Sequence, residues 1–523
     1  MAAPTGLGSP SLATTTPATL RQVTVSPLPI ERFEHVLDRQ GMERLRALAA
    51  HGRRRLAGRV IWNVNSTAHG GGVVEMLRPL LGYVRGAGVD ARWKVIEGDA
   101  AFFRITKRIH NRLHGMPGDG LELGPAARGH YEAVLAANLA ALAPLVRSGD
   151  AVILHDPQTA GLIPGLRARG ARVIWRCHVG LDTPNDIARS TWHFLLPYVS
   201  QADAYVFTRQ AFIWDGLDPA RASIIAPSID PFSPKNGELE GPTVHAILEA
   251  AGLVGGDGRV APVYTRIDGT PGRVDRTARL VEDVPIPPST PSVVQVSRWD
   301  RTKDPLGVML GFAEHVAPYC DAHLVLAGPD VESVADDPEG ADVLHEVMRR
   351  REELPAGRRR AVHLASLPMV DDQENAAIVN ALQRWATVVV QKSLAEGFGL
   401  TVAEAMWKGR PVVASRVGGI QDQIVDGTSG VLLDDPTVLT AYGEAVLGLL
   451  EDRARAQQIG HAAHLRARDE LIAPRHLAEW YTALLDALVD APGTIGPAGG
   501  DHVSADTCRP ALAAGGGPAE HRG

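Results

Sequence analysis

Two glutamates, Glu396 and Glu404, are separated by seven residues in the stretch EGFGLTVAE. Backbone amides at the start of a helix favour an anionic or hydroxyl-rich ligand, and residues 397–400 are expected to supply such amides. A carboxylate beside them repels phosphate but accepts hydrogen bonds from sugar hydroxyls. The stretch therefore predicts a site for a ligand that carries both a diphosphate and a sugar. The alternative is that Glu396 only complements the helix dipole and Glu404 is a solvated helix residue.

A basic pair, Arg298 and Lys303, follows a predicted strand in SRWDRTKDP. Fixed cations in a water-poor cleft stabilise negative charge where it develops, as on a departing diphosphate. The alternative is a surface salt-bridge cluster of Arg298 and Arg301 with Asp300 and Asp304. The chain contains no Asp-x-Asp triplet, so we expect the cations and helix dipoles to act in place of a divalent metal ion, and no metal or other cofactor to be needed.

Polar residues also end two predicted strands nearer the N-terminus, at Asp156 in HDPQ and His178 in RCHVGLD. Polar side chains at the carboxyl ends of parallel strands face the ligand cleft. A histidine after a buried strand is otherwise most often structural. His110 and His114 have the i, i+4 spacing of metal ligands, but a third ligand is not evident and the surrounding residues are basic, so no metal site is predicted there.

The elements around these residues alternate between strand and helix. Residues 387–390 are β-branched, a helix is predicted from Leu400, and Pro411–Ala414 resembles the next strand. This is a βαβ unit, which places the glutamates at the carboxyl edge of a parallel sheet. A second strand-to-helix turn contains Gly71 and Gly72, where backbone amides can approach a phosphate, although a turn without a ligand would look the same.

Several motifs together carry a family resemblance. EGFGLTVAE, EAMWKGRPVVAS, RVGGIQD and the S-R-x4-K pattern resemble the donor-binding segments of retaining GT-B glycosyltransferases of family GT4. Four segments are most similar in sequence to the trehalose glycosyltransferring synthases, namely VVVQKSLAEGFGLTVAEAMWKGRPVV, IDPFSPKN, HDPQ and RCHVGLD. The resemblance implies an α/β GT-B fold, in which two Rossmann-like doubly wound domains face a cleft.

The resemblance also implies a role for each candidate residue. Arg298 and Lys303 would hold the diphosphate and Glu404 the ribose. Gly71 and Gly72 would pack on the pyrophosphate, and Glu396 with the amides of Gly397, Phe398, Gly399 and Leu400 would hold the donor glucose. Asp156 and His178 would bind sugars on the acceptor side, and Arg298, Lys303, Glu396 and His178 form the expected catalytic set.

The implied reaction moves glucose from a nucleotide-diphosphate glucose to free glucose and forms α,α-trehalose with retention. A trehalose phosphorylase-like enzyme and a GT4 transferase with another sugar acceptor are the alternatives, and a ribose-binding Glu404 argues against the phosphorylase. A catalytically silent sugar-nucleotide-binding protein would lack the basic pair or Glu396, which are both present. The sequence does not indicate which nucleotide base the protein recognises.

The composition argues against a nucleic-acid-binding, a disulfide-stabilised or a membrane-spanning protein. The 523 residues carry a net charge of -7 and a pI near 6.3, and no basic run is interleaved with aromatics, so no nucleic-acid partner is expected. The three cysteines are far apart, which indicates a reducing compartment. With no apolar span and no signal-like start, we expect a cytoplasmic protein without membrane partners. Its partners would be small sugars and nucleotide sugars, and a homodimer is compatible with the sequence.

The predicted organisation has six parts, which are a disordered tail at 1–24, an N-terminal acceptor domain at 25–253, a linker at 254–291, a C-terminal nucleotide-sugar domain at 292–475, a cross-over helix at 476–490 and a disordered tail at 491–523.

Overall fold

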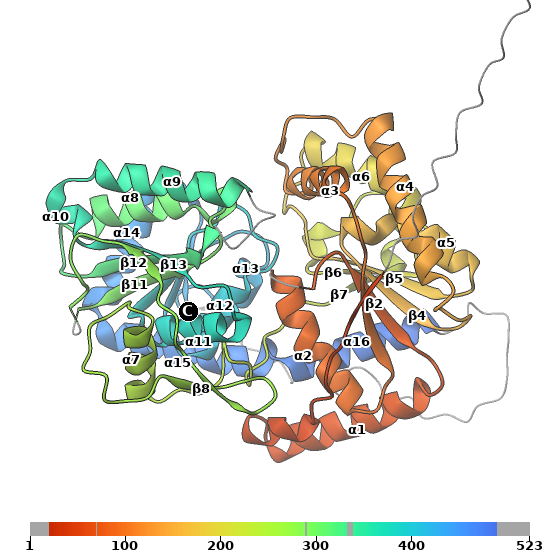
Figure 1. Cartoon of the computed structure of the whole chain (residues 1–523), viewed down its shortest axis with the longest axis horizontal. Coiled ribbons are helices and arrows are strands. Elements are labelled where there is room, and N and C mark those ends of the chain that lie inside the picture. The colour runs from red at the N-terminus through yellow and green to blue at the C-terminus, as the bar shows by residue number, and fades with distance from the viewer. Residues whose placement is uncertain (1–19, 69–70, 288–289, 332–337, 489–523) are drawn as a thin grey trace, which may run out of the picture.

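The computed structural model describes residues 20–68, 71–287, 290–331 and 338–488. Two seven-stranded sheets, each with helices on both faces, form two domains side by side (Figure 1). Residues 1–19 of the predicted tail at 1–24, and all of the predicted tail at 491–523, lie outside the described residues.

The first sheet is parallel except for one edge strand. In spatial order it contains β1 (Arg21–Val23), β3 (Ala91–Val95), β2 (Ile61–Asn65), β4 (Ala151–His155), β5 (Arg172–Cys177), β6 (Ala204–Phe207) and β7 (Ala222–Ile224). The central strands are buried on both faces, which explains their near-continuous apolar sequences. The strand order reverses beside β2, as in doubly wound sheets, so a ligand crevice is expected at its carboxyl edge.

Helices cover both faces of this sheet. Alternate strand residues pack on one face against α3 (Ala100–Leu113), α4 (Pro125–Leu142), α5 (Ile163–Ala168) and α6 (Asp186–Val199). The other face packs against α2 (Gly72–Gly86) and α16 (Ala473–Leu488), and α1 (Arg39–Arg55) covers these. Residues 21–23, which we predicted to be part of the disordered tail, instead form β1, antiparallel to β3.

The second sheet has the same plan. In spatial order it contains β10 (Arg279–Val281), β13 (Val362–Leu367), β12 (His323–Pro329), β11 (Ser292–Val296), β14 (Val388–Gln391), β15 (Val412–Ser415) and β16 (Val431–Leu433). Its helices are α7 (Gly241–Ala250), α8 (Pro305–His315), α9 (Pro338–Glu352), α10 (Ala356–Arg359), α11 (Asp372–Trp385), α12 (Leu400–Trp407), α13 (Ile420–Gln423), α14 (Leu439–Glu451) and α15 (Arg453–Glu470).

The predicted linker at 254–291 is partly structured. It contains a two-stranded hairpin of β8 (Val263–Thr265) and β9 (Pro271–Arg273), and β10 joins the second sheet antiparallel to β13. Buried Glu374 fixes this segment, because its Oε1 accepts from the amides of Asp275 and Arg276 at 2.7 and 2.8 Å. Helix α7, which we assigned to the first domain, packs in the core of the second with α11.

The chain passes between the domains twice, and the two passages run side by side. Ile229 and Ile472 form an isolated parallel bridge, with the Ile229 amide donating to the Leu471 carbonyl at 2.9 Å. After the second passage, α16 lies beside α1 and α2 of the first domain (Figure 1).

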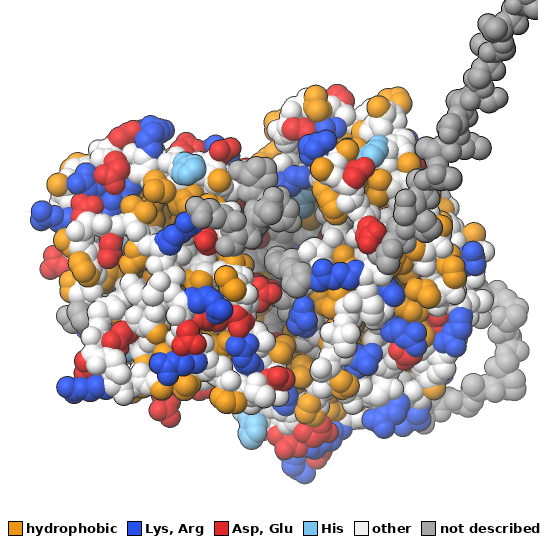
Figure 2. Space-filling model, in the orientation of Figure 1, with side chains coloured by type: hydrophobic (Ala, Val, Ile, Leu, Met, Phe, Trp, Pro, Cys, Tyr) orange, Lys and Arg blue, Asp and Glu red, His pale blue; other side chains and the backbone are white. Residues whose placement is uncertain are grey.

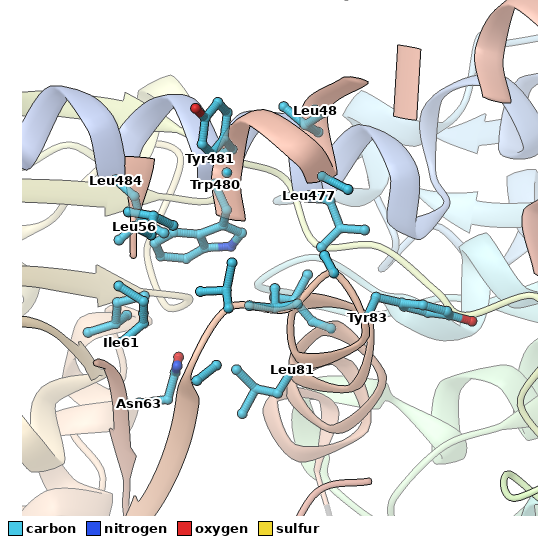
Figure 3. Close-up of a pocket in the computed structure, with 18 of the residues that line it drawn as sticks. Leu48, Leu56, Ile61, Asn63, Leu81, Tyr83, Leu477, Trp480, Tyr481 and Leu484 are labelled. Carbon is cyan, nitrogen blue, oxygen red and sulfur yellow. The ribbon is translucent and has the colours of Figure 1, made fainter. Parts of the chain in front are cut away.

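An apolar cavity of about 90 Å³ lies between α1, α2, α16 and β2, and Trp480, Ile61 and Leu81 are among the residues that line it (Figure 3). None of the predicted site residues lines it, so it is a packing gap rather than a reaction site. On the face shown in Figure 2, basic and acidic side chains are intermixed over both domains. No helix among the described residues is long and apolar enough to cross a bilayer.

Candidate active site

The first half of the site is the turn between β14 and α12. Gly399 caps α12 with φ 88°, a left-handed conformation that favours glycine. Gly418, from the RVGGIQD motif, packs on this turn so closely that a Cβ there would lie 1.7 Å from the Glu396 carbonyl oxygen. The turn is thus held in one shape by glycines that allow close backbone approach.

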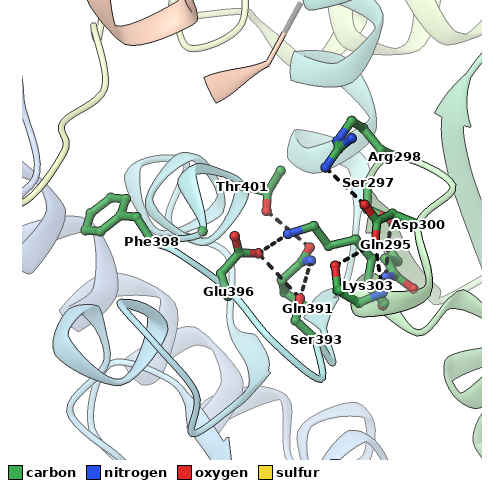
Figure 4. Close-up of polar contacts among 12 residues, drawn as sticks. Gln295, Ser297, Arg298, Asp300, Lys303, Gln391, Ser393, Glu396, Phe398 and Thr401 are labelled. Carbon is green, nitrogen blue, oxygen red and sulfur yellow. Dashed lines mark hydrogen bonds and ion pairs between the residues drawn. The ribbon is translucent and has the colours of Figure 1, made fainter. Parts of the chain in front are cut away.

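Lys303 and Glu396 form an ion pair at this turn (Figure 4). Their side chains are 15% and 12% exposed. Gln295 donates to the Lys303 carbonyl at 2.8 Å and fixes the backbone beneath the ammonium group. The cation predicted for the diphosphate and the carboxylate predicted for the donor sugar are therefore in direct contact.

Arg298 follows β11 by two residues, and its guanidinium donates to Asp300 at 3.1 Å (Figure 4). Burial raises the pKa of Asp300, but Arg298 and the Thr302 hydroxyl outweigh it and hold that pKa well below its usual range. The salt-bridge cluster considered above forms only in its Arg298–Asp300 pair, because Arg301 pairs with Glu346 at 2.8 Å and Asp304 with Lys392. Arg298, half-exposed, remains directed to the site.

Two predicted donor-binding residues contribute only their backbone. The Phe398 ring is 7% exposed and packs in the second core, on the far side of the turn from Lys303 (Figure 4). The Leu400 side chain instead faces Gly72, where a Cβ would lie 3.1 Å from Leu400 Cδ1. An apolar side chain has nothing to offer a hydroxyl, so the amides of residues 397–400 are the groups available there.

Glu404 is buried, with its side chain 3% exposed, so it is not the solvated helix residue considered above. Its Oε1 lies 3.7 Å from Lys235 Nζ, and its Oε2 is buried with no hydrogen-bond partner among the described residues. Burial raises the pKa of Glu404, and Lys235 opposes that rise. An unsatisfied buried carboxylate oxygen is costly, and two ribose hydroxyls would satisfy it.

The glycine turn of the first domain lies against the donor turn. Gly71 caps α2 with φ 80°, and Gly72 is the residue that meets Leu400. The amino ends of α2 and α12 are therefore neighbours, which places the positive ends of two helix dipoles together.

The two residues predicted for the acceptor side, Asp156 and His178, lie at the carboxyl ends of β4 and β5. Asp156 Oδ1 accepts from the His178 amide at 2.8 Å, and His178 Nδ1 lies 3.0 Å from Oδ2. The buried Arg176 donates through Nε to His178 Nε2 at 3.0 Å. Because Nε2 accepts, the proton of the neutral ring is on Nδ1 and is donated to Asp156.

The charges of this trio follow from their surroundings. Burial lowers the pKa of His178, so the ring is neutral at pH 7. Burial also opposes ionisation of Asp156, but the hydrogen bonds from His178 lower its pKa to about 2. Both ring nitrogens of His178 are occupied, so its expected catalytic role is not that of a free proton carrier. Its carbonyl instead reaches the donor turn, 2.6 Å from where a Cβ on Gly397 would lie.

Two neighbours of the site were not predicted from the sequence, namely His110 of α3 and His114, the residue that caps α3 at its C-terminus. Their rings are 5.0 Å apart, and each has a buried Nδ1 without a partner among the described residues. Burial is the main cause that lowers their pKa values, to about 3 and 4, and the charges of Arg298 and Lys303 add to it. The sequence analysis weighed this pair only as metal ligands and predicted no metal site there, so it assigned the two rings no role.

Two protein families match the chain. "Trehalose synthase, N-terminal domain" matches residues 63–214, and "Glycosyl transferases group 1" matches residues 278–466. The two matches fall on the two sheets and together include every predicted site residue. Asp156 and His178 lie in the first match, and Arg298, Lys303 and Glu404 in the second.

Curated relatives align over most of the chain. A trehalose synthase of Pyrococcus horikoshii is 34% identical over 460 residues, covering 88% of this chain and 96% of that protein. One of Rubrobacter xylanophilus is 34% identical over 463 residues, covering 88% and 97%. A trehalose phosphorylase of Pleurotus pulmonarius is 25% identical over 450 residues, covering 80% of this chain and 56% of that protein.

Solved structures agree on the fold. Sucrose-phosphate synthase from Thermosynechococcus elongatus matches with TM-score 0.55 at 18% identity, over 82% of this chain and 100% of that one. An α,α-trehalose-phosphate synthase (UDP-forming) from Burkholderia xenovorans matches with TM-score 0.60 at 16% identity, over 82% and 100%. The predicted fold, two doubly wound domains in the GT-B arrangement, is confirmed.

Proposed function

The chain belongs to the family of the trehalose synthases, which are glycosyltransferases, and from that premise we propose that it transfers glucose from a nucleoside-diphosphate glucose to free glucose. The product would be α,α-trehalose, formed with retention at the donor anomeric carbon. The observation that supports this most is the Lys303–Glu396 pair at the donor turn, against which the His178 carbonyl of the acceptor side packs.

On the donor side, each protein group binds one part of the nucleotide sugar. The diphosphate displaces Glu396 from the ammonium of Lys303 and also contacts Arg298, while Glu396 and the amides of residues 397–400 receive the glucose hydroxyls. Glu404 accepts from the ribose through its open Oε2. These contacts place the anomeric carbon between the two domains.

In the reaction, the bond from the anomeric carbon to the diphosphate oxygen breaks, and a bond to the acceptor oxygen forms on the same face. The acceptor hydroxyl gives its proton to the departing diphosphate oxygen. His178 is not available as the base because both ring nitrogens already have partners. Lys303 and Arg298 stabilise the charge on the leaving group.

The acceptor hexose would lie against Asp156, whose ionised carboxylate accepts from sugar hydroxyls. Neutral His110 and His114 can both donate to and accept from hydroxyls, so they fit the same uncharged ligand. No divalent metal is proposed for this chemistry, and activity should persist in EDTA. Complete loss that Mg²⁺ or Mn²⁺ restores would oppose that part of the proposal.

A phosphorylase-like reaction is the second candidate, because trehalose phosphorylases are among the relatives. It would use inorganic phosphate in place of the nucleotide and would have no use for Glu404. A buried Glu404 with an open oxygen therefore favours the nucleotide sugar.

The deciding experiment incubates the protein with UDP-, ADP- or GDP-glucose and ¹³C-labelled glucose, or with trehalose and phosphate. NMR identifies the product and its anomeric configuration, and the Lys303→Ala variant serves as the inactive control. Labelled α,α-trehalose from one nucleotide sugar supports the proposal. Glucose 1-phosphate from trehalose and phosphate alone would replace it with the phosphorylase, and transfer to a different sugar would change the acceptor.

A further inference from the structure

Three charged side chains connect the two domains beside the donor turn. Lys235 Nζ lies 2.7 Å from Glu75 Oε2 and 3.7 Å from Glu404 Oε1. The lysine side chain is 17% exposed, Glu404 is 3% exposed and Glu75 is 45% exposed. The ammonium group thus lies between two carboxylates from different domains, in a largely buried place where such pairs are weakly screened.

The backbone around Lys235 is fixed to the second domain. Asn380 of α11 donates to the carbonyls of Pro234 and Gly237 at 3.0 and 2.8 Å. Trp407 of α12 donates to the Asn236 carbonyl at 3.1 Å. Lys235 therefore moves with α11 and α12, and its contact with Glu75 is the one that reaches across to the first domain.

Glu75 is in the first turn of α2, three residues after Gly72. Since Gly72 already meets Leu400 at the start of α12, the lysine holds together the two helices whose amino ends form the donor site. A second lysine, Lys408, is also close to Glu404, but its ammonium is occupied by Asn236 Oδ1, Gln383 Oε1 and the Glu404 carbonyl, at 3.0, 2.8 and 3.2 Å. All three of its protons have partners.

We propose that Lys235 is a positioning residue for the donor: it keeps the buried Glu404 carboxylate ionised for the ribose hydroxyls and ties that carboxylate to α2. This inference rests on the proposed use of a nucleotide sugar. A buried carboxylate without a nearby cation takes up a proton, and a protonated carboxyl group loses the acceptor that a second ribose hydroxyl needs. Lys235 does not touch the donor and acts only through Glu404 and Glu75.

The test is calorimetry with the nucleoside diphosphate that the wild type binds best among UDP, ADP and GDP, and with its 2′,3′-dideoxy counterpart. We expect Lys235→Met to weaken binding of the ribonucleotide at least 10-fold and to change binding of the dideoxy compound less than 2-fold. Lys235→Arg, which keeps the charge, should recover most of the affinity. Arg266→Met is the matched control, because it breaks a 2.8 Å ion pair with Asp371 within the second domain and should leave both affinities unchanged.

The contact between Lys235 and Glu75 is tested separately, by its effect on kcat. Glu75→Gln leaves Lys235 beside Glu404, so nucleotide binding should stay within about 3-fold of wild type, while kcat should fall at least 10-fold because α2 is no longer tied to α12.

Equal losses for ribose and dideoxy nucleotides in Lys235→Met would overturn the inference and give the lysine a general structural role. Unchanged ribonucleotide binding in that variant would overturn it too. A wild-type protein that binds none of the three nucleotides would instead refute the proposed function, which is a different outcome.

Discussion

At the scale of single residues, Asp156 has a backbone conformation that its neighbours impose. Its φ is 63°, and among the described non-glycine residues only Asp304 is also positive. Such conformations are costly and persist where surrounding contacts determine them. Here the contacts are those from the His178 amide and ring, which hold the carboxylate at the cleft.

Removal of the Asp156 carboxylate should weaken the use of the acceptor sugar and leave binding of the donor largely unchanged. A lost carboxylate leaves hexose hydroxyls unpaired, at a cost of about 1–3 kcal/mol each, so Asp156→Ala should slow transfer to glucose about 10- to 100-fold while slow donor hydrolysis survives. Asp156→Asn is the matched variant, because asparagine tolerates positive φ. Calorimetry of donor binding beside a transfer assay measures both effects, and equal losses would mean that Asp156 only supports the fold.

The basic pair should matter far more than the arginine between its members. Arg298→Ala or Lys303→Ala removes a charge-assisted contact worth about 3 kcal/mol and should lower the transfer rate at least about 100-fold. Arg301→Ala is the control, because Arg301 is 60% exposed and pairs with Glu346 instead. Initial rates with circular dichroism of each variant test this, and near wild-type turnover in either of the first two variants would rule out the diphosphate site.

At the scale of elements, one of the contacts between the two domains at the turn before α12 is made by backbone alone. Gly397 has no room for a Cβ, because the His178 carbonyl oxygen would lie 2.6 Å away. A methyl group there must push the donor turn away from the acceptor strand, by a displacement that reaction geometry does not tolerate.

We therefore expect Gly397→Ala to lower kcat at least about 10-fold with a similar melting temperature. Gly448→Ala, at an open position of α14, should leave kcat unchanged and stabilise the helix by up to about 1 kcal/mol. Steady-state kinetics and thermal melts compare the two, and wild-type kcat in Gly397→Ala would show that this contact is not needed for catalysis.

Elements whose apolar residues recur with a clear strand or helix period could be predicted from the sequence, as could the polar residues at the ends of these elements. β14, the turn, α12 and β15 were predicted because buried β-branched runs alternate with a helical pattern. β10 and α7 were misassigned because short edge strands and helices after a domain passage carry no signal for which core they join. Lys235 lies in the IDPFSPKN motif, but the spacing of nearby residues does not show that its ammonium group contacts Glu75 and Glu404. Local spacing likewise does not show that α3 lies beside the cleft.

At the scale of the whole molecule, buried neutral histidines make stability depend on pH. His155 and His363 are 2% and 1% exposed, and burial lowers the pKa of each to about 3. Fully buried His476 is shifted in the same direction by burial. In the unfolded chain these rings take up protons below about pH 6.5.

The stability from these rings is therefore complete above pH 6.5 and is lost as the pH falls from there towards 3. Each ring contributes up to about 1.4 kcal/mol per pH unit. Urea unfolding at pH 7.5, 6.5 and 5.5 should give a falling free energy, with a smaller slope in His363→Gln and an unchanged slope in His461→Gln, whose side chain is exposed. A free energy that is constant over this range would contradict neutral burial.

The paired passage at Ile229 and Ile472 also determines how the molecule bears a mechanical load. Gln22 and Asp486, both exposed, lie in the first domain, and the second domain is inserted between the two adjacent segments that contain Ile229 and Ile472. A force applied between these two residues runs through β1, the first sheet and α16 and bypasses the second domain. Under tension the first domain should rupture first, and the second should hold as a separate, later event.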